Sequence, residues 1–194
     1  MAKFNKTGAY KPVEKIDIYI WGRYVGACAL DPILGYYVFA YDRDFGKSGI
    51  ELSPLHMPLR DTEEPFVFTD LPEATYKRLP ALLADSLPDD FGNALINRYL
   101  AGKGVAATQI SPLDRLAYMG DRSMGALEFR PRRGPKNETS TALEMNALVG
   151  EARKLVRGTL ESSDNTSAAL RSVIDVGTSA GGARAKAEIG RAHV

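Results

Sequence analysis

The sequence predicts an α+β protein in which a small, mostly antiparallel sheet comes first and helices follow. Three observations support this prediction. Isoleucines alternate with polar or aromatic residues over 16–20, which is the period of a half-buried strand. The segments 24–30 and 36–41 are rich in small, aromatic and β-branched residues and indicate two more strands. Beyond residue 90, apolar residues recur at helical spacing.

The strands follow in order along the first third of the chain. Trp21-Gly22-Arg23 forms a turn between 16–20 and 24–30, so these two strands are expected to pair as a hairpin. Short extended pieces are expected around 50–52 and at 66–68. A further strand is expected at 126–129, after the glycine at position 120.

Two helices carry clear boundary signals. Pro88, Asp89 and Asp90 precede the apolar stripe of 91–100, and proline and acidic residues are favoured in a first helical turn. Gly102 ends this helix. Ser111 is a typical N-cap for a shorter helix that Gly120 ends. Further along, an amphipathic helix is expected at about 141–160 and a strand at 173–176.

Composition limits the classes of protein. The 194 residues are 44% hydrophobic and 25% charged with a net charge of +1, which is typical of a globular domain without a general attraction for nucleic acid or membranes. The single Cys28 excludes an internal disulfide and is expected in the core. No apolar run of about 18 residues occurs, and the polar residues 1–14 lack a signal peptide, so we expect a cytoplasmic protein.

Clustered charges in the first 130 residues leave alternatives open. Asp85, Asp89 and Asp90 lie around a helix start, where capping is the simpler interpretation and a metal or general-base role the other. Asp121 and Arg122, between two glycines, are either solvated or paired across the turn. We assign no metal-binding residue, because the two histidines and one cysteine do not make a histidine-rich metal site.

The most chemically suggestive stretch follows the expected strand at 173–176. It reads Gly177-Thr178-Ser179-Ala180-Gly181-Gly182-Ala183-Arg184-Ala185-Lys186. Glycines bring backbone N–H groups close to a ligand, and successive N–H groups form a nest for phosphate oxygens. The stretch has neither the Walker A nor the dinucleotide-binding pattern, and a flexible turn between strands is the alternative.

Three blocks together are more specific than any one of them. The segments LPALLADSLPDDFGNALINRYL, SPLDRLAYMGDRSMGALEFRP and VGTSAGGARAK follow one another here as they do in HipA-family proteins, and the resemblance covers roughly 14–187. It implies a β-rich N-terminal subdomain, the start of a kinase-like ATP-binding lobe, and a helical C-terminal lobe that this sequence lacks. It also implies transfer of the γ-phosphate of ATP, with Mg²⁺, to serine or threonine of a protein substrate. The implied partner is a HipB-like DNA-binding antitoxin, through which alone nucleic acid would be contacted.

The resemblance also places site residues and domain boundaries. Its glycine-rich phosphate loop corresponds to Gly177, Thr178, Ser179, Ala180, Gly181, Gly182, Ala183, Arg184 and Lys186, with Thr178 or Ser179 as candidate autophosphorylation sites. The expected divisions are a flexible lead-in at 1–13, the N-terminal subdomain at 14–131, a linker at 132–140, the start of the kinase-like core at 141–187, and a tail at 188–194.

The resemblance assigns no catalytic residue to this sequence. The family's catalytic Asp, its Asn partner and its metal-binding Asp all follow the glycine-rich loop, and only eight residues follow Lys186 here. Residues 188–194 resemble a translated sequencing adapter, so we expect a truncated reading frame and an inactive fragment that binds ATP and Mg²⁺ weakly. The alternatives are a native tail and a stand-alone, non-catalytic module that binds an antitoxin or another protein.

Overall fold

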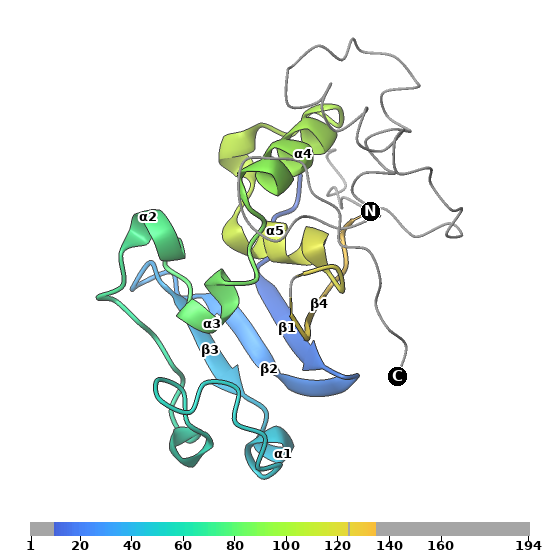
Figure 1. Ribbon diagram of the computed structural model, residues 1–194. Coiled ribbons are helices and arrows are strands. Elements are labelled where there is room, and N and C mark those ends of the chain that lie inside the picture. The colour runs from blue at the N-terminus through green and yellow to red at the C-terminus, as the bar shows by residue number, and fades with distance from the viewer. Residues whose placement is uncertain (1–9, 124, 135–194) are drawn as a thin grey trace.

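The base of the fold is a four-stranded antiparallel sheet. The computed structural model describes residues 10–123 and 125–134. Strands β1 (Lys15–Ile20), β2 (Arg23–Leu30), β3 (Tyr37–Tyr41) and β4 (Leu127–Arg130) lie in the order β3-β2-β1-β4 (Figure 1). The expected hairpin and third strand are confirmed, and the last strand is confirmed with a shift of one residue. The predicted α+β class therefore holds for this part of the chain.

Two expected extended pieces differ from the structure. Phe66 makes a single antiparallel bridge to Phe39 through two backbone hydrogen bonds of 2.9 and 2.7 Å, and no strand forms at 66–68. Pro65 has no N–H, which limits the pairing on that side. Residues 50–52 also form no strand. Ile50 and Leu52 pack against the core from a loop, so their apolar side chains are partly buried without a strand partner.

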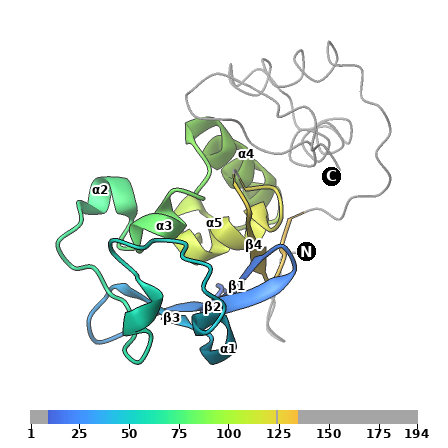
Figure 2. The ribbon, with the colours of Figure 1, turned by 60° about the horizontal axis from the view of Figure 1, so that its bottom comes forward.

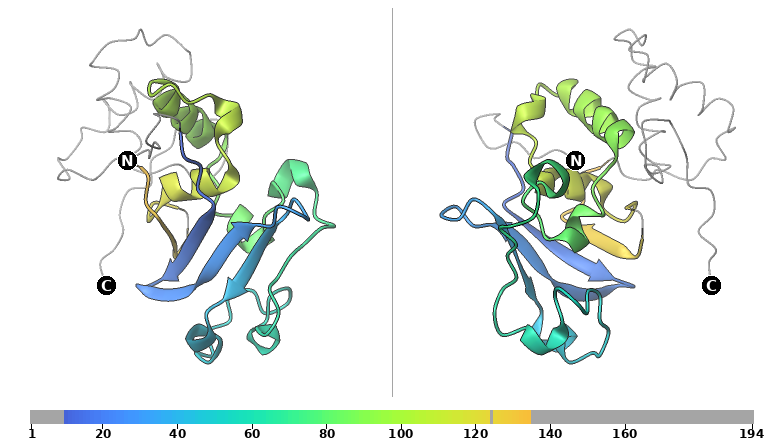
Figure 3. Two further views of the ribbon diagram at one scale, coloured as in Figure 1. Left: turned by 180° about the vertical axis from the view of Figure 1, so that it is seen from behind. Right: turned by 60° about the vertical axis from the view of Figure 1, so that its left-hand side comes forward.

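The helices gather on one side of the sheet. The described helices are α1 (Arg43–Gly46), α2 (Glu73–Tyr76), α3 (Ala81–Ala84), α4 (Asp90–Ala101) and α5 (Pro112–Met119), with 3₁₀ turns at Leu59–Asp61 and Ala107–Gln109. Helices α3 and α5 lie against the sheet, and α4 packs on α5 farther from it (Figures 1, 2 and 3). Within the described ranges, no helix has the length and apolar character needed to cross a lipid bilayer.

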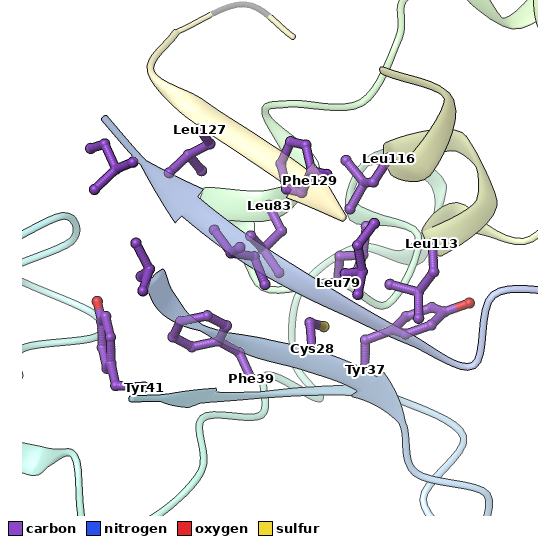
Figure 4. Packing of buried hydrophobic residues seen from close by; sticks show 14 of the residues in the cluster. Cys28, Tyr37, Phe39, Tyr41, Leu79, Leu83, Leu113, Leu116, Leu127 and Phe129 are labelled. Atoms are coloured by element: carbon purple, nitrogen blue, oxygen red, sulfur yellow. The ribbon is translucent and has the colours of Figure 1, made fainter. Parts of the chain in front are cut away.

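The main core lies between the sheet and helices α3 and α5. Inward-facing strand residues such as Cys28, Phe39 and Phe129 meet Leu83 and Leu116 from these helices (Figure 4). All five are 0% exposed, which confirms the expected core position of Cys28. A second, smaller cluster joins α4 to α5 through Ile96, Leu100, Val105, Ile110 and Tyr118.

Helix boundaries follow the predicted capping residues. Asp89 precedes α4, and its Oδ1 accepts a hydrogen bond of 2.8 Å from Gly92 N. Ser111 precedes α5 and shares a capping box with Asp114, in which each side chain accepts from the other residue's backbone N–H. Both N-cap predictions are confirmed, as is the end of α4 at Gly102.

One glycine is required by the close approach of two strands. Gly26 lies in β2 opposite Tyr41 of β3, next to an irregularity in the β1–β2 register at Ile18 and Tyr19. A Cβ added at Gly26 would overlap the carbonyl oxygen of Ala40 and lie 2.9 Å from Tyr41 Cα. Only glycine fits here without displacing the backbone of β3.

Candidate functional site

The candidate phosphate-binding residues fall beyond the part of the chain that the structure describes. Gly177, Thr178, Ser179, Ala180, Gly181, Gly182, Ala183, Arg184 and Lys186 all lie outside residues 10–134, as do the expected helix at 141–160 and the start of the kinase-like lobe. Their role as an ATP site stays a prediction. The described residues instead contain a buried polar cluster and an exposed aromatic surface.

The acidic residues near α4 serve the helix start. Asp89 caps α4, as described above, and Asp90 occupies its first turn, where a negative charge favours the positive end of the helix dipole. Over residues 10–123 and 125–134, no three His, Cys, Asp or Glu side chains come together in a way that could hold a metal ion. The structure thus favours the capping interpretation for Asp89 and Asp90, whereas Asp85 lies at the end of α3.

The buried polar cluster is centred on Asp114, which is 0% exposed in the first turn of α5. Its Oδ2 accepts hydrogen bonds from the backbone N–H and hydroxyl of Ser111, at 3.0 and 2.9 Å. Its Oδ1 accepts from Tyr10 Oη at 2.9 Å, Val13 N at 2.8 Å and Arg133 Nη1 at 3.3 Å. This carboxylate therefore joins the N-terminal lead-in, helix α5 and the residues after β4.

Arg133 is the cationic member of this cluster, and its side chain is 5% exposed. Besides Asp114, its Nη1 donates to the carbonyl oxygen of Lys11 at 2.5 Å, and its backbone N–H donates to Ala117 O at 2.8 Å. We call the set Tyr10, Lys11, Val13, Ser111, Asp114 and Arg133 the junction. Sequence reasoning placed Arg133 in an exposed linker because its neighbours are polar, and no local pattern marks it as buried.

The junction contains an ion pair whose two charges offset each other, and beside it Tyr10 stays protonated. Burial, together with the negative charge of Asp114 and the hydrogen bond to it, raises the pKa of Tyr10 to about 12. Tyr10 thus stays a neutral hydrogen-bond donor at physiological pH. Because Asp114 is buried and both of its oxygens accept hydrogen bonds from donors of this chain, the carboxylate binds and orients chain segments.

The turn before β4 has contacts that settle the alternatives for Asp121 and Arg122. Asp121 Oδ2 lies 2.8 Å from Arg132 Nη1, and Arg122 Nη2 donates to the carbonyl oxygen of Tyr118 at 2.7 Å. Asp121 is thus ion-paired and Arg122 is hydrogen-bonded to a backbone carbonyl, so each has a partner outside the turn rather than the other. The Arg122 guanidinium also lies against Gly134, where an added Cβ would be 2.8 Å from Tyr118 O.

Arg115 fixes helix α4 on helix α5. Its Nη1 donates to Asn93 Oδ1 at 2.8 Å and its Nη2 to Asn97 Oδ1 at 3.1 Å, while Asn93 Nδ2 donates to Pro88 O at 2.9 Å. Burial lowers the pKa of this guanidinium. These bonds connect the start of α4 to the helix that carries Asp114.

The exposed aromatic surface lies on the outer face of the sheet and at the tip of the β1–β2 hairpin. Tyr19 and Tyr24 pair across β1 and β2 with their ring centroids 5.3 Å apart. Arg130 of β4 lies over the Tyr19 ring at 4.0 Å, the geometry of a cation–π interaction. Trp21, 71% exposed, occupies the turn with φ of 49°. Sequence reasoning missed this surface, although aromatic residues at outward positions of a predicted strand are a readable signal.

The comparisons with known proteins agree with the fold and with the three sequence blocks. A family profile described as the HipA N-terminal domain matches residues 16–130, which is more than half of the chain. The comparisons with curated proteins and with solved structures found no match. The matched range begins in β1 and ends at the last residue of β4, so it coincides with the described sheet and helices.

Proposed function

Because the chain belongs to the HipA N-terminal domain family, we propose that it is part of a serine/threonine kinase toxin of a type II toxin–antitoxin system. The observation that carries this proposal is the family match over 16–130, continued by a glycine-rich segment of the expected kind at 177–186. In this proposal, the described domain does no chemistry. It supports the lobe that binds the nucleotide and contacts a HipB-like antitoxin.

The proposal gives the glycine-rich segment a defined task. Backbone N–H groups around Gly181 and Gly182 would surround the phosphates of ATP, and Lys186 would add positive charge. ATP with Mg²⁺ would supply the transferable γ-phosphoryl group. The sequence contains no counterpart of the aspartates that hold Mg²⁺ or of the residue that positions the hydroxyl nucleophile. We therefore propose that the activity belongs to a longer parent protein.

The test compares the 194-residue chain with the protein encoded by the full reading frame in the source genome. We expect the longer protein to transfer labelled γ-phosphate from ATP to itself or to an added protein, and the 194-residue chain to show no transfer. Lys186→Ala should lower the transfer rate by about 100-fold, since electrostatic stabilisation of this kind is worth about two to four kcal/mol. Lys103→Ala, in the turn that follows α4, is the matched control and should leave the rate unchanged.

The outcome that contradicts the kinase proposal is a full reading frame without Mg²⁺-binding aspartates, or a longer protein that transfers no phosphate. Transfer by the 194-residue chain would contradict the assignment of the activity to a longer parent. Micromolar ATP binding by the 194-residue chain in a calorimetric titration would contradict the expectation of a weak, incomplete nucleotide site.

A second function is a stand-alone interaction module, and the exposed aromatic surface favours it. Trp, Tyr and Arg are the residues enriched at the energetic centres of protein interfaces, and Trp21, Tyr24 and Arg130 expose this combination on one sheet. In this function, the chain binds an antitoxin or another protein without phosphate transfer. Trp21→Ala and Tyr24→Ala should each weaken binding to a candidate DNA-binding antitoxin by about tenfold or more. Leu55→Ala, which changes an apolar residue that is 85% exposed, is the control.

A further inference from the structure

We propose that Asp114 and Arg133 form a latch through which the N-terminal lead-in, residues 10–13, holds the exit of the domain, residues 131–134. This inference stands on the contacts of the junction and does not depend on the kinase proposal. The lead-in and the exit lie at opposite ends of the described chain, yet they meet at one buried carboxylate.

The two segments share atoms as well as a location. Asp114 Oδ1 accepts from Val13 N and Tyr10 Oη of the lead-in and from Arg133 Nη1 of the exit. The same Arg133 Nη1 donates to Lys11 O and lies 3.4 Å from Tyr10 Oη. The guanidinium also lies near the Tyr10 ring, at 5.7 Å from its centroid. Each segment therefore completes the binding site of the other.

Removing the lead-in would leave the ion pair with fewer partners and open it to water. Asp114 would lose two donors, and Arg133 would lose the carbonyl of Lys11 and the contact with Tyr10. A buried ion pair is stable only when additional hydrogen bonds satisfy its remaining polar groups. The exit would keep the Arg133 backbone bond to Ala117 and the ion pairs of Arg132 with Asp121 and Glu128.

The consequence is local, because the sheet is held together elsewhere. Strands β2 and β3 pair with each other, and β2 pairs with β1, without a contact to Tyr10 or Arg133 in their ladders. A protein or ligand that pulls Tyr10 and Lys11 away from Asp114 and Arg133 would thus loosen residues 131–134, while Val13 and the sheet stay packed in the main core. By linkage, an event that displaces Arg133 would release the lead-in to the same degree. The junction is a conformational device that couples the two ends of the domain.

The test measures amide hydrogen exchange by NMR in the 194-residue chain. In a variant that lacks residues 1–11 and so keeps Val13 in the main core, the Arg133 amide should exchange at least about tenfold faster, because the Tyr10 and Lys11 partners of the ion pair are lost. Tyr10→Phe removes a single donor to Asp114, keeps the ring, and should raise the same rate by about threefold. Amides of β2 should stay within about twofold in both variants.

The control is Glu14→Gln, which changes a side chain that is 81% exposed and pairs with Lys11 at the surface. It should leave the Arg133 rate unchanged. An unchanged Arg133 rate in both lead-in variants would overturn the latch. A rise at Arg133 that β2 amides match would also overturn it, because the lead-in would then stabilise the whole domain rather than its exit.

Discussion

Replacing Asp114 with asparagine should destabilise the domain more than any other isosteric change at a charged residue. Asparagine keeps the shape of the side chain, but it removes the negative charge that lies 3.3 Å from Arg133 Nη1. It also places an NH₂ group, which is a donor, against one of the backbone N–H donors of Val13 and Ser111. Both partners are almost fully buried, with side-chain exposures of 0% and 5%. Breaking a buried pair by removing one charge costs about 3–5 kcal/mol.

Because asparagine retains one acceptor oxygen, we take about 3 kcal/mol as the expected loss in the free energy of unfolding. For a domain of about 120 residues, each kcal/mol lowers the melting temperature by roughly 3–5 °C, so the transition should fall by about 10–15 °C. Circular dichroism during heating and urea titration measure the two quantities. Asp61→Asn, at an exposed pair with Arg60, is the control and should cost less than about 0.5 kcal/mol.

A double variant separates the charge effect from packing. Asp114→Asn combined with Arg133→Gln removes both charges, so it should lose less stability than the sum of the two single variants. A loss of less than about 1 kcal/mol for Asp114→Asn alone would refute the argument. Additive losses in the double variant would show that the two charges do not interact across the junction.

Three more predictions concern the core and the sheet. Gly26→Ala should lower stability by about 1–3 kcal/mol or more in urea titration, because its Cβ would overlap Ala40 O. Burial raises the pKa of the Cys28 thiol to about 12, so the native protein should not react with a thiol reagent at pH 8, whereas the urea-unfolded chain should react at once. Burial also raises the pKa of Tyr37 and of Tyr41 from 10.0 to about 12. Above pH 10 these tyrosines ionise in the unfolded chain before they do so in the folded one, so their contribution to stability is complete below pH 10 and is lost as the pH rises from 10 to 12.

A specific result would contradict each of these three predictions. A Gly26→Ala protein as stable as the parent would show that β2 and β3 can separate without cost. Thiol reaction of the folded protein within minutes would place Cys28 at the surface. In the alkaline range, the free energy of unfolding should fall by about 1.4 kcal/mol per pH unit for each of the two tyrosines, and a flat profile from pH 10 to 12 would contradict their burial.

The local elements of this fold could be predicted from the sequence because their signals are short-range. The alternation of 16–20 and the turn at Trp21-Gly22 predict the β1–β2 hairpin, and Asp89 and Ser111 predict two helix starts. Each signal depends on backbone geometry within about one helical turn or one strand pair. The short helices α1, α2 and α3 were missed, since four residues are too few to show a period.

The junction could not be predicted, because it depends on residues far apart in the sequence. Nothing near Arg133 distinguishes it from the exposed arginines beside it, and only its contacts with Asp114 and Lys11 reveal that it is buried. Tyr10 lies in a segment that we expected to be flexible from its polarity. For the candidate nucleotide site the situation is reversed. Its residue pattern from Gly177 to Lys186 can be recognised in the sequence, but these residues lie outside the part of the chain that the structure describes.

The order of the strands sets when this domain can be completed during synthesis. Strands β1, β2 and β3 emerge from the ribosome first and can pair at once, but the outer position beside β1 belongs to β4, where Asp17 meets Arg130. Until β4 and the helices before it are translated, one edge of β1 and the apolar side of the sheet are open to other chains. We therefore expect nascent chains that end before residue 127 to associate with chaperones, and those that extend well beyond residue 134 to release them.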